Sequence, residues 1–283
     1  MNKSSLLSAV AVCLLASSLM AQTTQPQVKI PADGDNNGVN ALAALKASPR
    51  HGEWVDVAMP GADTKIKSFV VYPERKDKAP VVIVIFEIFG MSDWIRGVTD
   101  QLAAEGFIAI APDLLSGYGP NGGGTESLGN NVGQTIRLLT PEEQAKRLDA
   151  VRDYAIKLPA ATDKVGCVGF CWGGGASFNY AARQPKLNAA VVYYGTPPEK
   201  ALMEKITCPV LGCYGGNDAR VTATVEPTKA TMAELKKSYE PHIYEGAGHG
   251  FLRQHTGATG EANLKASQQA WPTTIAFFKK NLE

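Results

Sequence analysis

The sequence predicts an α/β fold in a single domain, with a mostly parallel central sheet covered by helices on both faces. Three observations predict it. Short apolar runs recur from residue 81 onward, helix-like segments separate them, and a chain of 283 residues can bury one large core. Continuous apolar runs are typical of strands covered on both faces, and strand–helix alternation is typical of parallel sheets. Ligand sites of such sheets lie beyond the carboxyl ends of the strands.

Residues 1–21 have the layout of a cleaved export signal. Lys3 gives a positive start, an apolar stretch covers 6–20, and the small residue Ala21 precedes a polar sequence. The apolar stretch is too short for a typical spanning helix. We therefore expect an exported protein, periplasmic or secreted, that has no membrane contact after signal cleavage. An uncleaved membrane anchor is the alternative.

Residues 22–50 are polar and turn-rich, with one helical patch at 39–46. We expect an N-terminal extension that partly packs on a domain of residues 51–283. Two strand-like runs at 53–58 and 66–72, joined by a turn with Pro-Gly, predict a hairpin-like entry to the sheet.

The remaining elements follow from alternation of apolar runs and amphipathic segments. The capping box Thr140-Pro-Glu-Glu starts one helix, and Pro272 is expected to kink or split the last one. Strands are predicted over 81–86, 107–111, 165–170, 189–194, 210–214 and 242–244, and helices over 92–105, 141–158, 172–183, 225–237 and 262–282.

A glycine-rich stretch at 116–131 breaks this alternation. Long stretches of this kind inside a compact domain are commonly functional or disordered. The sequence predicts either a mobile lid or pocket rim, or a flexible surface loop.

Composition favours small-molecule chemistry. The net charge is +1, and no basic stripe favours nucleic acid as a partner. Neither H-E-x-x-H nor metal-ligand cysteine spacing occurs, so we expect no metal and no cofactor. A monomer is the expected state. Cys167, Cys208 and Cys213 lie in or beside apolar strands and are interpreted as buried structural thiols.

Cys171 differs from these because of its turn. The sequence VGFCWGGGAS at 168–177 joins a buried strand to a helix, with glycines two residues before and after the cysteine. This is the arrangement of the G-x-S-x-G nucleophile elbow, with cysteine in place of serine. A nucleophilic thiol needs a base, and that base needs an orienting acid.

Asp218 and His249 follow Cys171 in the order nucleophile, acid, histidine, and each comes just after a predicted strand. Alone, the aspartate would be a turn former, the histidine an incidental loop residue and the cysteine a packing residue. Together, at the ends of three strands of one fold, they predict a catalytic triad.

Glu87 ends the most hydrophobic strand, where a carboxylate is costly unless it is paired. It is either a structural salt-bridge partner or a functional carboxylate of the crevice, and we favour the latter. Arg253, four residues after His249, is a natural partner for Glu87 or for a substrate carboxylate.

With these residues in place, the sequence resembles the dienelactone hydrolase (carboxymethylenebutenolidase) family. The matching motifs are E-I-F-G at 87–90, A-P-D-L at 111–114, G-x-C-x-G-G at 169–174, Gly-Gly-x-Asp at 215–218 and A-G-H-x-F-x-R at 247–253.

The resemblance implies an α/β-hydrolase fold and a Cys171, His249, Asp218 triad. It also implies that Glu87 helps to deprotonate the thiol when substrate enters, and that Arg253 contacts the substrate carboxylate. Family members use a second arginine from the segment after A-P-D-L, but here no arginine occurs there before Arg137. This departure puts the dienelactone itself in question as substrate.

The preferred hypothesis is hydrolysis of a small ester or lactone through an acyl-enzyme, with the backbone N–H groups of Ile88 and Trp172 as oxyanion hole. One alternative is a broader esterase or acyl-peptide-type hydrolase acting on larger substrates. The other is a catalytically idle α/β-hydrolase scaffold that binds a small molecule or a partner, because function does not follow from fold.

Overall fold

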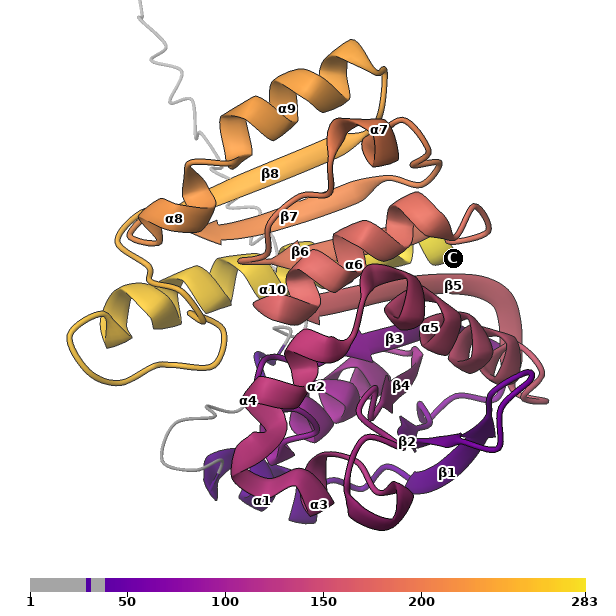
Figure 1. The fold of residues 1–283 in the computed structure, drawn as a ribbon. Coiled ribbons are helices and arrows are strands. Elements are labelled where there is room, and N and C mark those ends of the chain that lie inside the picture. Colours follow the sequence, from indigo (N-terminus) through magenta and orange to yellow (C-terminus); the bar gives the residue numbers. More distant parts are fainter. Residues whose placement is uncertain (1–28, 32–38) are drawn as a thin grey trace, which may run out of the picture.

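The computed structural model describes residues 29–31 and 39–283, so the predicted export signal lies outside the described residues (Figure 1). Eight strands form one sheet in the order β1-β2-β4-β3-β5-β6-β7-β8. β1 and β2 pair antiparallel, as do β2 and β4, and all other neighbours are parallel. The strands are β1 (Gly52–Ala58), β2 (Lys65–Val71), β3 (Ala79–Ile85), β4 (Ile108–Pro112), β5 (Ala161–Phe170), β6 (Ala189–Tyr193), β7 (Val210–Gly215) and β8 (Tyr239–Tyr244).

Helices cover both faces of this sheet, which confirms the predicted fold class. In Figure 1, α5 (Pro141–Ala155) and α6 (Trp172–Arg183) lie in front of the sheet and α10 (Gly260–Leu282) lies behind it. The other helices are α1 (Val39–Lys46), α2 (Asp93–Ala104), α3 (Thr125–Leu128), α4 (Val132–Thr135), α7 (Lys200–Met203), α8 (Ala219–Thr222) and α9 (Val225–Glu234). In the described part of the chain, no helix combines the length and apolarity that crossing a membrane requires.

The central strand β3 carries the core. Every residue of β3 is buried, and so is Phe86 beyond it, because β4 and β5 flank the strand and helices cover it. A run of apolar side chains therefore suits both faces. This burial fixes where the chain emerges at the carboxyl edge of the sheet.

Several elements differ from their predicted bounds; β5, for example, begins at Ala161, four residues before the predicted start. β8 begins at Tyr239, three residues before the predicted start, because an edge strand with mixed exposure has no continuous apolar run. α10 runs without a break through Pro272, where a kink or split was expected. Trp271 and Ile275 on either side are buried against the core, and this packing outweighs the proline's local penalty.

The glycine-rich stretch consists of short helical turns instead of an irregular loop. Its anchor is Asp113, at the end of β4. The carboxylate of Asp113 accepts hydrogen bonds from the backbone N–H and the hydroxyl of Thr125, at 2.7 and 2.8 Å, and from the Leu115 N–H at 3.1 Å. A residue within the A-P-D-L motif thus attaches the stretch to the sheet.

The described part of the N-terminal extension packs on α2. Ala41 of α1 is fully buried, and the carboxylate of Asp100 on α2 holds the chain that follows α1. It accepts hydrogen bonds from the Ser48 hydroxyl at 2.5 Å and from Arg50 Nε and Nη2 at 3.0 and 2.5 Å. The ion pair is largely buried, so its loss leaves a guanidinium uncompensated.

We expect Asp100→Asn to lower the free energy of unfolding by about 3 kcal/mol, because breaking one side of a buried pair exposes the other to the desolvation cost. Asp77→Asn is the matched control, since its carboxylate pairs with Arg75 at the surface. Urea denaturation measures both. Equal small effects would show that the extension does not depend on Asp100.

Candidate active site

The sheet register brings the predicted site residues to one edge. Ile85 on β3 pairs with Gly169 on β5, and Phe170 pairs with Tyr193 on β6. Two residues beyond the first pair, Glu87 and Cys171 therefore leave the sheet at the same level. The chains that follow β7 and β8 bring Asp218 and His249 to this edge.

Cys171 occupies a sharp turn between β5 and α6. Its φ is 56°, a left-handed conformation that is rare for residues other than glycine. The turn is held by a hydrogen bond from the Cys171 N–H to the Tyr193 carbonyl, at 3.0 Å. A Cβ on Gly173 would collide with the backbone of β3, and one on Gly174 would collide with that of β6. The glycines of the motif thus allow α6 to begin directly on the sheet.

The thiol, imidazole and carboxylate form a continuous series of contacts. His249 Nε2 lies 3.0 Å from Cys171 Sγ, and His249 Nδ1 lies 2.5 Å from Asp218 Oδ2. The hydrogen bond to Cys171 and then that to Asp218 raise the pKa of His249 to about 9, although partial burial opposes this. A protonated imidazole between a sulfur and a carboxylate is therefore favoured in the folded protein.

The loop that carries His249 depends on Asn263 of α10, which is fully buried. Asn263 Oδ1 accepts a hydrogen bond from the Gly248 N–H at 2.8 Å, and its Nδ2 donates to the Gln254 carbonyl at 2.7 Å. The sequence analysis missed this residue, because nothing in its local pattern marks a helix asparagine as the support of a distant loop.

Glu87 and Arg253 form an ion pair beside this series. Arg253 Nε donates to Glu87 Oε2 at 2.7 Å, and its guanidinium lies over the ring of Phe89, 4.9 Å from the centroid. Glu87 is buried, and burial raises its pKa while Arg253 opposes the rise. The sequence suggested two partners for Arg253, Glu87 or a substrate carboxylate. The structure shows Arg253 bound to Glu87.

Tyr194 is a second site residue that the sequence analysis missed. It is buried, its φ is 40°, and its ring centroid lies 5.1 Å from that of His249. Its hydroxyl is near Glu87 but makes no hydrogen bond of normal geometry within the described residues. The available signal in the sequence was its place at the end of the predicted strand 189–194, directly before Gly195.

A cavity of about 380 Å³ opens above Cys171. Ile88, Trp172 and Tyr194 line it, and so do polar side chains from α5, α6 and α8. Within the described residues, the backbone N–H groups of Ile88 and Trp172 donate no hydrogen bond, and Trp172 is the first residue of α6. Both groups are therefore available to an oxygen atom in the cavity.

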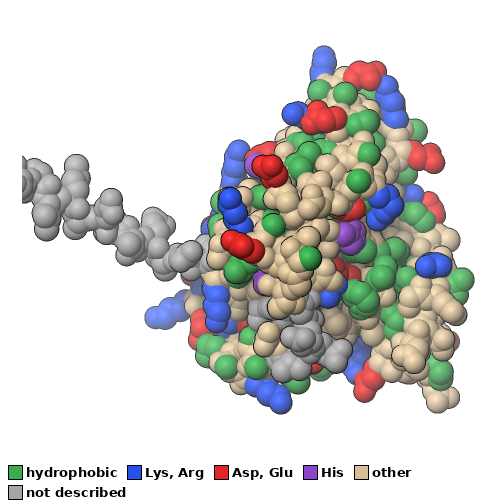
Figure 2. Space-filling model, turned by 90° about the vertical axis from the view of Figure 1, so that its left-hand side faces the viewer, with side chains coloured by type: hydrophobic (Ala, Val, Ile, Leu, Met, Phe, Trp, Pro, Cys, Tyr) green, Lys and Arg blue, Asp and Glu red, His purple; other side chains and the backbone are tan. Residues whose placement is uncertain are grey.

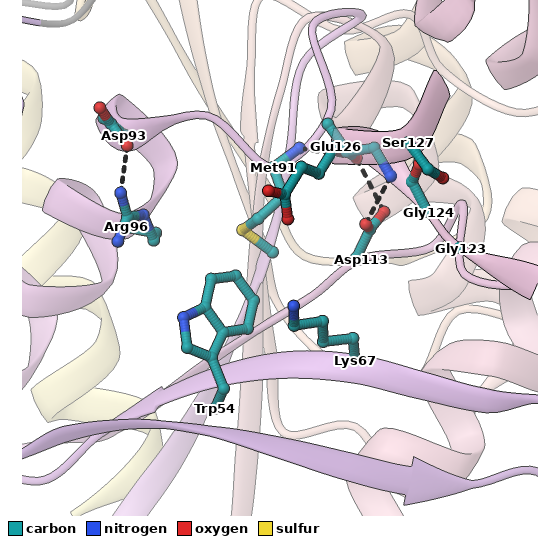
Figure 3. Close-up of a pocket in the computed structure, with 11 residues that line it drawn as sticks. Trp54, Lys67, Met91, Asp93, Arg96, Asp113, Gly123, Gly124, Glu126 and Ser127 are labelled. Carbon is teal, nitrogen blue, oxygen red and sulfur yellow. Dashed lines mark hydrogen bonds and ion pairs between the residues drawn. The ribbon is translucent and has the colours of Figure 1, made fainter. Parts of the chain in front are cut away.

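A larger cleft of about 780 Å³ lies on the other side of the turn that follows β3. Figure 3 shows Trp54 and Lys67 on one wall and Asp113, Gly124 and Glu126 facing them. Lys67 Nζ lies 5.0 Å from the Trp54 ring centroid. The glycine-rich stretch lines this cleft and contributes no lining residue to the Cys171 cavity.

Charges of both signs are interspersed on the face drawn in Figure 2. Among the described residues, no group of three or more His, Cys, Asp or Glu side chains is placed to hold a metal ion. Cys167, Cys208 and Cys213 are buried free thiols, and burial raises the pKa of each. Cys171 is the exception, since it is partly exposed.

Comparisons with known proteins show what the chain is similar to in sequence and in fold. The sequence model of the dienelactone hydrolase family matches residues 66–282. A Salmonella typhimurium protein provisionally named carboxymethylenebutenolidase is 30% identical over 234 residues, 78% of this chain and 85% of the relative. A Klebsiella pneumoniae structure provisionally described as a dienelactone hydrolase has a TM-score of 0.69 at 25% identity, and covers 81% of this chain and 98% of its own.

A more distant likeness shows the fold alone. The acylaminoacyl peptidase of Pyrococcus horikoshii has a TM-score of 0.66 at 15% identity, and the match covers 86% of this chain but 44% of that chain.

Gly173→Ala tests whether α6 must begin directly on β3. Its Cβ would lie 2.5 Å from the Ile85 carbonyl oxygen, so we expect a loss of about 3 kcal/mol in unfolding free energy. At Gly175 a Cβ meets nothing closer than 3.5 Å, so Gly175→Ala should be neutral or stabilising by about 0.5 kcal/mol. Thermal unfolding compares them, and a stable Gly173→Ala variant would contradict the packing.

The raised pKa of His249 predicts a pH dependence of stability. The folded pKa of about 9 exceeds the ordinary 6.5, so protonation of His249 stabilises the fold fully below pH 6.5, and this contribution is lost by about pH 9. Urea denaturation of the protein and of His249→Gln measures it. The stability difference between them should shrink across that range, and a pH-independent difference would refute the assignment.

Proposed function

The chain belongs to the dienelactone hydrolase family, and from this premise we propose that it hydrolyses a small ester or lactone with Cys171 as nucleophile. The family match supports hydrolase activity of the dienelactone hydrolase type. The cysteine mechanism rests on one observation, the contact series from Cys171 through His249 to Asp218.

In the first half-reaction, Glu87 accepts the thiol proton while His249 is already protonated, and Cys171 Sγ attacks the carbonyl carbon as a thiolate. Asp218 keeps the imidazole oriented through Nδ1. The N–H groups of Ile88 and Trp172 stabilise the developing oxyanion, a contribution of about 3 kcal/mol per donor in such sites. His249 then gives its proton to the departing alkoxide, and a thioester remains on Cys171.

In the second half-reaction, water attacks the thioester. His249, now neutral, accepts a proton from that water, the acid leaves, and Glu87 returns its proton to the sulfur, so the thiol is restored. No group outside the chain and its substrate is consumed except water.

Glu87 and Arg253 regulate the thiol in this proposal, a role that the family resemblance suggests. At rest the carboxylate is bound to Arg253. When substrate enters the cavity and rearranges the carboxylate, Glu87 leaves Arg253 and helps to deprotonate Cys171. The thiol would then become reactive only with substrate present, which limits its oxidation in an exported protein.

A broader esterase on larger esters has one observation in its favour. Ile88 lines the Cys171 cavity and Met91 lines the larger cleft, so the turn that carries both residues borders both spaces. A long ester could occupy both. The idle-scaffold alternative has no such support, because a binding protein does not need a thiol, an imidazole and a carboxylate in contact.

We expect Cys171→Ala to lower the turnover of both p-nitrophenyl acetate and a carboxylated lactone by at least about a thousandfold, because the covalent step is lost. Cys208→Ala is the matched control, since Cys208 is a buried thiol that does not line the Cys171 cavity, and it should retain activity. Initial rates measure both.

Two results would overturn the proposal. Undiminished ester turnover by Cys171→Ala would exclude the cysteine mechanism. Absence of turnover by the unmodified protein on a broad ester and lactone panel, together with binding of those ligands, would favour the idle scaffold. Cleavage of the simple ester alone would mean that the substrate class differs from a carboxylated lactone.

A further inference from the structure

We propose that Arg220 binds a carboxylate of the substrate and thereby sets the specificity of the Cys171 cavity. This inference rests on the proposed hydrolase function and identifies a feature of its substrate. It assigns the anion-binding role to α8, the short helix that begins directly after Asp218.

The charge of the cavity lining carries the inference. Among the described residues that line the cavity, Arg220 is the one with a formally charged side chain at neutral pH, and none of them carries a carboxylate. The other lining residues are Ile88, Pro141, Gln144, Cys171, Trp172, Gly175, Ala176, Asn179, Tyr194, Thr196 and Val221. A small, partly apolar space with one guanidinium at its wall favours a ligand with one negative charge.

The guanidinium of Arg220 is available to such a ligand. Arg220 is exposed, and in the described part of the chain it makes no ion pair and no side-chain hydrogen bond. Arg253 differs, because it is already bound to Glu87. A guanidinium without a protein partner can form two parallel hydrogen bonds to a carboxylate without breaking an existing ion pair.

The backbone of Arg220 is fixed relative to the proposed catalytic residues. The N–H groups of Val221 and Thr222 donate to the Asp218 carbonyl, at 3.1 and 2.9 Å. Val221 is buried and anchors the turn in the core. Arg220 therefore extends from a turn whose position is coupled to Asp218, and hence to His249.

The place of Arg220 also accounts for the arginine that the sequence lacks after A-P-D-L. Residues 116–131 line the other cleft, and Arg137 does not line the Cys171 cavity. A substrate anion would thus be held near the carboxyl end of β7 and not near that of β4. With the anion-binding arginine near β7 instead of β4, the protein should prefer substrates whose carboxylate reaches α8.

The test compares two esters of similar acyl length, neutral p-nitrophenyl butyrate and anionic mono-p-nitrophenyl succinate. Arg220→Gln should lower kcat/KM for the succinate ester about 10- to 100-fold, mainly through KM, because a charge-assisted hydrogen bond is lost. Its effect on the butyrate ester should stay within about twofold. Arg220→Lys should retain part of the preference, because it keeps the charge without the planar fork.

Arg137→Gln is the matched control, since Arg137 is an exposed arginine outside the Cys171 cavity, and it should leave both kcat/KM values unchanged. An equal loss on both esters after Arg220→Gln would overturn the proposal and assign Arg220 a structural role near Asp218. No loss on either ester would also overturn it.

A second measurement separates this proposal from the hydrolase mechanism. Cys171 is alkylated with anionic iodoacetate and with neutral iodoacetamide, and mass spectrometry follows both rates at that residue. Arg220→Gln should lower the iodoacetate-to-iodoacetamide rate ratio several-fold even if the protein hydrolyses no ester. An unchanged ratio refutes the anion site, whereas a lowered ratio without ester turnover refutes only the hydrolase proposal.

Discussion

Cys171 reaches the carboxyl edge of the sheet because the first turn of α6 packs directly on the backbones of β3 and β6. Glycines at 173 and 174 make this contact possible, since any side chain there would meet main-chain atoms. The same packing forces Cys171 to a φ of 56°. A non-glycine residue at this angle costs about 1–3 kcal/mol, which the surrounding sheet must offset. In this conformation the Cys171 thiol faces both His249 and the cavity.

Charge around that thiol is arranged in two separate pairs. Asp218 stabilises the protonated His249, while Arg253 compensates Glu87, which would otherwise be an isolated buried carboxylate. The two pairs meet at Tyr194, whose ring packs on His249 and whose hydroxyl lies near Glu87. A substrate anion that disturbs one pair would therefore also change the electrostatic environment of the other. Arg220 stands outside both pairs, and in the part of the chain that the structure describes no carboxylate pairs with it, so its positive charge is available to the cavity.

The sequence predicts the sheet and the contact between Cys171, Asp218 and His249, because both follow from local patterns at the ends of strands. Residues that act across the fold escape this reasoning. Asn263 supports the His249 loop from 15 residues away, and Arg220 faces the cavity only because α8 turns back beside Asp218. The glycine-rich stretch was expected to be a mobile lid or pocket rim, or a flexible surface loop; it lines a cleft, but Asp113 attaches it beside a cleft other than the Cys171 cavity. Such placements depend on tertiary contacts, which composition and periodicity do not encode.

Acid quenching of the protein during ester turnover, followed by peptide mass spectrometry, tests the covalent mechanism most directly. The account predicts that the peptide containing Cys171 gains one acyl group during turnover, and that hydroxylamine removes it, as expected for a thioester. The label should be absent from the peptides of Cys167, Cys208 and Cys213, whose thiols are buried. Ester turnover with the acyl group on another residue, or without any trapped acyl group under conditions where deacylation limits the rate, would contradict it.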